Sequence, residues 1–161
     1  MLIALLMLGA GELAQAKTPP LTAYVVREEG GGLGVFVDKT ITFTKIAGAP
    51  TYWIARRDER NQRMGKPEVV HLWIDGRTCP AVEDVLRRAA KLPSPRIAGP
   101  DEVMGSGWVS DAPYVSLTAL PQTPNGYDQT ITRKELQGPV ADWWRNAETA
   151  LAPCWRTGEP G

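Results

Sequence analysis

Apolar and polar residues alternate along much of the first half of the chain. Between residues 40 and 46, Ile41, Phe43 and Lys45 share one side of an extended backbone and threonines occupy the other. This period of two is typical of a strand with one exposed face. Similar strand-forming stretches lie at residues 23–27, 35–37, 51–57 and 69–74, with a glycine-rich turn at 30–34 and a charged loop from Asp58 to Pro67. The pattern predicts antiparallel hairpins or a meander.

The period changes after Pro80, where apolar residues recur at the spacing of one helix face. The residues that share this face are Val82, Val85, Leu86 and Ala89. Thr78 is a suitable N-cap, acidic residues come early and basic residues late, and Pro93 ends the segment. We therefore predict an amphipathic helix here.

A further strand pair and a second helix follow. Residues 114–120 and 127–132 have strand-forming composition, with a loop at 121–126 between them. From Gly138 onward, one helix face carries Val140, Trp143, Trp144, Ala147 and Leu151. Pro153 ends this helix. The whole pattern predicts an α+β fold, with a mostly antiparallel sheet and two amphipathic helices packed on one face.

Two cysteines lie at matched positions relative to these helices. Cys79 is at the start of the first predicted helix, and Cys154 follows the end of the second. We predict one disulfide between them, which would bring the two Cα atoms within about 7 Å and make side-by-side helices antiparallel. The alternatives are a redox-active or nucleophilic cysteine, or two free buried thiols. The chain has no Cys-x-x-Cys pattern to favour a redox role.

The first residues have the pattern of an export signal. Residues 2–8 are an unbroken apolar run, and Ala14-Gln15-Ala16 is of the type that a signal peptidase cleaves. The run is too short to span a membrane, which takes roughly 20 apolar residues. No lysine or arginine precedes it, so the N-terminal amine or an upstream start would supply the charge. We predict a signal peptide at 1–16, a single domain at 17–161 and a periplasmic or secreted location; the alternative is an N-terminal core element.

The charge balance narrows the range of partners. Lys plus Arg and Asp plus Glu stand at 18 each, and removing residues 1–16 takes away only Glu12, leaving a net charge of +1. A near-neutral chain has no electrostatic reason to bind nucleic acid or anionic lipid. No later stretch is apolar enough to span a membrane, so we expect no stable membrane insertion of the mature chain.

The sequence offers little catalytic chemistry. His71 is the single histidine, which excludes metal sites built on two or three imidazoles. The partners for a Ser-His-Asp arrangement would be Ser106 or Ser110, with Asp75, Asp101 or Asp111. No Gly-x-Ser-x-Gly elbow frames either serine. We expect an ordinary strand histidine.

Other site motifs are equally weak. The glycines at 30–34 fit neither a dinucleotide nor a Walker pattern. Asp101, Glu102 and Asp111 could supply a carboxylate pair, but nothing in their spacing selects them. No calcium-loop pattern occurs. We predict no cofactor and no metal, and we assign no catalytic residue.

Two features indicate a binding surface. The stretch from Arg56 to Lys66, at and beyond the end of the strand predicted at 51–57, carries Arg56, Arg57, Arg60 and Arg63. Among the tryptophans, Trp108, flanked by glycines in another predicted loop, is the candidate for an exposed recognition residue. The alternatives are a solvated loop and a tryptophan in the core.

These observations favour a non-catalytic, exported domain that binds a protein, a glycan or a cell-envelope component. One alternative is a cell-envelope hydrolase that uses loop carboxylates or His71. Another is an inhibitor of an extracellular enzyme, for which a rigid, disulfide-linked domain with a protruding loop would be suitable.

Overall fold

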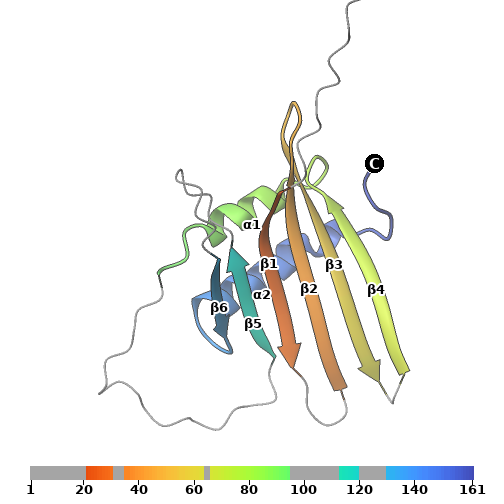
Figure 1. Ribbon diagram of the computed structural model, residues 1–161, viewed down its shortest axis with the longest axis vertical. Helices are drawn as coiled ribbons and strands as arrows, with labels where there is room; N and C mark the ends of the chain where they lie inside the picture. Colours follow the sequence, from red (N-terminus) through yellow and green to blue (C-terminus); the bar gives the residue numbers. More distant parts are fainter. Residues whose placement is uncertain (1–20, 31–34, 64–65, 95–112, 120–129) are drawn as a thin grey trace, which may run out of the picture.

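The computed structural model describes residues 21–30, 35–63, 66–94, 113–119 and 130–161. Its six strands form one antiparallel sheet in the order β4-β3-β2-β1-β5-β6 (Figure 1). The strands are β1 (Leu21–Gly30), β2 (Val35–Ile46), β3 (Tyr52–Arg63), β4 (Lys66–Asp75), β5 (Tyr114–Ala119) and β6 (Ile131–Glu135). The helices are α1 (Ala81–Ala89) and α2 (Pro139–Leu151), and a 3-10 turn (Ala152–Cys154) follows α2. The predicted mostly antiparallel sheet with two helices is confirmed.

The strands β3 and β4 are longer than the sequence pattern suggests. The prediction of a charged loop from Asp58 to Pro67 is wrong, because β3 continues to Arg63 and β4 begins at Lys66. Its charged residues have partners in the sheet: Asp58 lies opposite His71, and Glu59 pairs with Arg57. Polar pairs between neighbouring strands stabilise a sheet, so a charged stretch need not be a loop.

Helix α1 has the predicted buried face but a different beginning. Val82, Val85, Leu86 and Ala89 are all buried. Thr78 is not the N-cap: Pro80 occupies that position, with no capping bond from a side chain. The Thr78 hydroxyl instead donates a hydrogen bond of 3.1 Å to the Asp75 carbonyl, in the turn that leads out of β4.

A single apolar core joins the sheet to the helices. Val26, Ile41, Phe43 and Ala55 of the sheet belong to the same buried cluster as residues from α1 and α2. The two helices contact each other, and the buried Trp143 indole of α2 donates a hydrogen bond of 3.1 Å to the Val85 carbonyl of α1.

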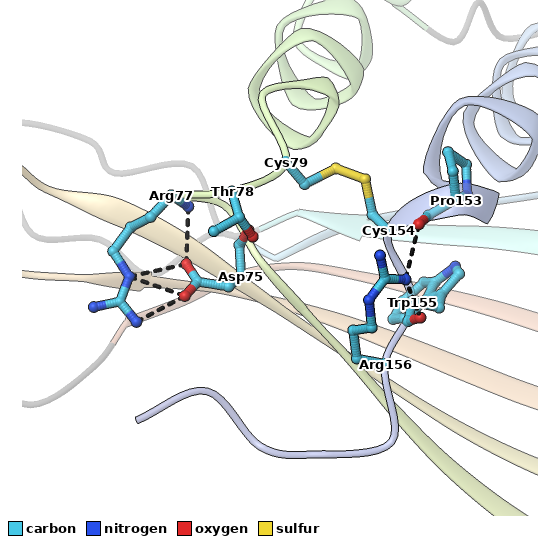
Figure 2. The surroundings of a disulfide bond; sticks show 8 residues. All are labelled: Asp75, Arg77, Thr78, Cys79, Pro153, Cys154, Trp155 and Arg156. Atoms are coloured by element: carbon cyan, nitrogen blue, oxygen red, sulfur yellow. Dashed lines mark hydrogen bonds and ion pairs between the residues drawn. A yellow bond between two sulfur atoms is a disulfide. The ribbon is translucent and has the colours of Figure 1, made fainter.

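The predicted disulfide joins Cys79 to Cys154, with a Cα–Cα distance of 6.1 Å (Figure 2). It connects the segment before α1 to the end of the turn after α2. Because the middles of the two helices also meet, they run antiparallel, as expected from the cysteine positions. Among the described residues, neither helix is long and apolar enough to cross a membrane.

Candidate functional site

The strand register divides the sheet residues between two faces. Ile41 pairs with Arg57 and Phe43 with Ala55, so these four side chains share the face that carries the buried cluster, which we call the core face. The residues that alternate with them along each strand, including Asp58, point to the other side of the sheet, which we call the opposite face.

A groove of about 480 Å³ lies on the core face beside β4. Its apolar walls are formed by Ile41, Leu72, Trp144, Leu151 and Trp155. Three charged side chains, Lys39, Arg57 and Glu148, also line it. We call this feature the Trp155 groove. Mostly apolar walls with a few polar groups, at this volume, are typical of ligand-binding sites.

Lys39 closes one side of the groove with two ion pairs. Its ammonium lies 2.8 Å from Glu28 of β1 and 2.6 Å from Glu148 of α2. The residue is only 8% exposed. Burial on its own would lower the pKa of Lys39, but the hydrogen bonds and Coulombic attraction from Glu148 and Glu28 outweigh it and hold that pKa above its ordinary value. The lysine therefore stays charged and fixes α2 against β1 and β2.

Arg57 is fixed at the opposite side of the groove. Its guanidinium forms an ion pair with Glu59 and lies 5.8 Å from the centroid of the Trp155 ring. The Nε atom is buried and has no hydrogen-bond partner in the described part of the chain. Buried donors of this kind are rare in folded proteins.

Strand β4 is an edge of the sheet, and the chain's own C-terminal segment pairs with part of it. The Trp73 N–H donates to the Arg156 carbonyl (2.8 Å), and the Arg156 N–H donates to the Trp73 carbonyl (2.9 Å). Because backbone groups alternate in direction along a strand, the backbone groups of Val69 and His71 face the same outer edge as those of Trp73, and there they have no backbone partner in the described part of the chain. Val69 is 56% exposed.

The opposite face of β3 and β4 carries a polar cluster around His71. The Nδ1 atom of His71 lies 2.6 Å from an Asp58 oxygen, which also lies 2.9 Å from the Arg56 guanidinium. Arg56 in turn lies 5.2 Å from the centroid of the Trp73 ring. The acid beside His71 is thus Asp58, which the sequence did not suggest.

The structure places one of the aspartates proposed for His71 in another role. Asp75 is bound by Arg77 at 2.7 Å, and these hydrogen bonds lower the pKa of the Asp75 carboxyl. The remaining candidates, Ser106, Ser110, Asp101 and Asp111, lie outside the described residues, as does Glu102.

The predicted arginine surface is distributed over the sheet. Arg56 and Arg60 lie on the opposite face, whereas Arg57 lies on the core face. Arg63 is the last residue of β3, and its side chain is outside the described part of the structure, as is the whole of Trp108. Whether these residues act together remains a prediction.

Of the residues that line the Trp155 groove, the sequence pattern singled out Arg57 alone as part of a binding surface. A signal for Lys39 was also present in β2, where Lys39 points to the same side of the strand as the core residues Ile41 and Phe43. A charged residue at a core position needs a buried partner, so parity could have singled it out. The position of Trp155, by contrast, depends on the disulfide and on the pairing of Arg156 with Trp73. A local sequence pattern does not predict either contact.

Comparison with protein-family models, with curated proteins and with solved structures finds no match to this chain. Among the described residues, no group of three histidines, cysteines or acids is arranged to hold a metal ion.

Proposed function

We propose that the protein is an exported domain that binds a protein, a glycan or another cell-envelope component at the Trp155 groove. The observation that carries this proposal is the groove itself, in which two tryptophans and a partly unsatisfied arginine meet. Tryptophan and arginine are the residue types most enriched in binding hot spots. In this proposal α1 and α2 cover the core face together, leaving the groove beside β4.

Export is the second part of the proposal. The Cys79–Cys154 disulfide supports it, because disulfides persist mainly in oxidising compartments. The apolar run at 2–8 and the small residues at 14 and 16 support a signal peptide at 1–16. The domain at 17–161 would then act in the periplasm or outside the cell.

Binding is better supported than either alternative. His71, the residue proposed for a hydrolase, has a side chain that is 54% exposed, on a sheet face rather than in an enclosed pocket. The inhibitor hypothesis relied on a protruding charged loop, and residues 58–63 are part of β3 instead. The Trp155 groove requires neither feature.

A photo-crosslinking experiment in the native host tests the proposal. A photoreactive amino acid replaces Thr149, an exposed residue that lines the groove. The matched control carries it at Arg88, an exposed residue of α1 outside the groove. We expect a discrete adduct from position 149 and none from position 88. Adducts of equal yield at both positions, or none at either, would contradict groove binding.

A further inference from the structure

We propose that the free edge of β4 receives an extended polypeptide segment as an added antiparallel strand, with one side chain of that segment in the Trp155 groove. This inference rests on the proposed function and narrows the ligand to a polypeptide. Strand addition to an exposed sheet edge is an established mode of peptide recognition, in which backbone bonds supply affinity and side-chain pockets supply specificity.

The backbone of β4 shows that this edge accepts an antiparallel segment. Arg156 already makes two hydrogen bonds with Trp73, at 2.8 and 2.9 Å. Further along the same edge, Val69 and His71 have no backbone partner among the described residues. Each offers one N–H and one carbonyl. Pro67 has the same parity and lacks an N–H, so it limits the edge on its other side.

The side chains around this edge define the chemistry of the added strand. On the core face, Leu72 and Trp155 form the groove wall nearest β4, so an apolar side chain is favoured there. On the opposite face, the exposed Val69 of β4 is paired across the strands with Arg60 of β3, which is also exposed. Arg60 has no ion-pair partner in the described part of the chain. An acidic side chain is therefore favoured on that side.

Residues of an added strand alternate between the two faces, so the fitting segment alternates apolar and acidic residues. In an antiparallel pair, the residues opposite Val69 and His71 make the backbone bonds and point to the same face as Val69. In this segment those are the acidic residues. The N–H groups of its apolar residues point away from β4.

This geometry gives a direct test with N-methylated peptides. The probe is the synthetic peptide acetyl-Thr-Val-Glu-Val-Glu-Val-Thr-amide, titrated into the isotope-labelled, oxidised protein while amide and indole NMR signals are followed. We expect the signals of Val69, His71 and Trp155 to shift. N-methylation of both glutamates should weaken binding about tenfold or more, because it removes the donors that face β4. N-methylation of the valines should leave the affinity nearly unchanged.

A matched pair of protein variants makes the same test from the other side. Val69→Pro removes an edge N–H that takes no part in the pairing of β4 with β3, whereas Val69→Ala trims the side chain and keeps the N–H. We expect only Val69→Pro to lose peptide affinity. If Val69→Pro fails to fold, the methylated peptides still decide the question.

The failure of strand addition is distinguishable from the failure of the proposed function. If both methylated peptides bind equally and still shift Trp155, the groove binds side chains and strand addition is wrong. If no peptide binds while Thr149 crosslinks in the host, groove binding survives and strand addition is again wrong. If neither experiment gives a signal, the proposed function itself fails.

Discussion

Lys39 is the residue on which the groove side of the core depends. An ammonium buried between two carboxylates is stable only while its partners are present, and each carboxylate in turn depends on the lysine. Removing one member of such a cluster leaves uncompensated charge in a poorly solvated place.

We predict that Lys39→Met lowers the free energy of unfolding by about 2–3 kcal/mol near neutral pH, a value reduced for the partial exposure of Glu148. The folded-state pKa of Lys39 is raised, so its contribution is complete below the ordinary pKa of 10.5 and is lost as pH rises through the higher folded value. The difference between wild type and Lys39→Met should therefore shrink above that pH. Urea denaturation across pH measures it.

The control for this prediction is Lys45→Met, which changes an exposed lysine of the same strand and should alter stability by less than about 0.5 kcal/mol. Equal effects of the two substitutions would show that the buried ion pairs contribute nothing.

Gly76 lies in close contact with the backbone of Trp53, which gives a second prediction for a single residue. A Cβ atom at this position would lie 2.6 Å from the Trp53 carbonyl oxygen, to which the Gly76 N–H donates a bond of 2.8 Å. We predict that Gly76→Ala destabilises the protein by about 1–3 kcal/mol, because backbone must move to admit the methyl group. Gly158→Ala, with no atom within 4 Å of the added carbon, is the matched control and should be neutral in thermal unfolding. Two neutral variants would be incompatible with the close approach of the chain at Gly76.

At the scale of elements, local pattern predicts helices better than strand ends. The buried face of α1 follows from its 3.6-residue period, because that period is complete within one segment of sequence. The length of β3 does not, because Asp58 and Arg60 owe their place in a strand to partners on β2 and β4. The Trp155 groove was beyond prediction for the same reason: Leu72 and Trp155 come from distant parts of the chain and meet only in the fold.

The link between α1 and α2 gives a prediction at this scale. The disulfide closes a loop with a sequence separation of 75 residues, for which chain entropy gives roughly 4–5 kcal/mol of stabilisation. We predict that the double variant Cys79→Ala and Cys154→Ala loses about that much stability relative to wild type in oxidising buffer. Under reductant the two proteins should denature at similar urea concentrations. A loss that is the same in both buffers would assign the effect to packing of the buried Cys79 rather than to the bond.

In the whole molecule, the disulfide connects the two helices to the edge of the sheet at β4. The disulfide holds the end of α2 near the start of α1, and Trp155 and Arg156 follow directly, so the bond also places the groove wall and the segment paired with β4 (Figure 2). We therefore expect peptide binding to depend on the oxidation of Cys79 and Cys154. A reduced protein should lose peptide affinity at the β4 edge along with stability.

Native intact-mass measurement of the protein recovered from the envelope and the medium of its own host tests export, the disulfide and binding together. We expect a chain that begins at Lys17, is lighter by two hydrogens because Cys79 and Cys154 are joined, and carries a bound partner. A chain recovered from the cell interior, still beginning at Met1 and with two free thiols, would contradict it.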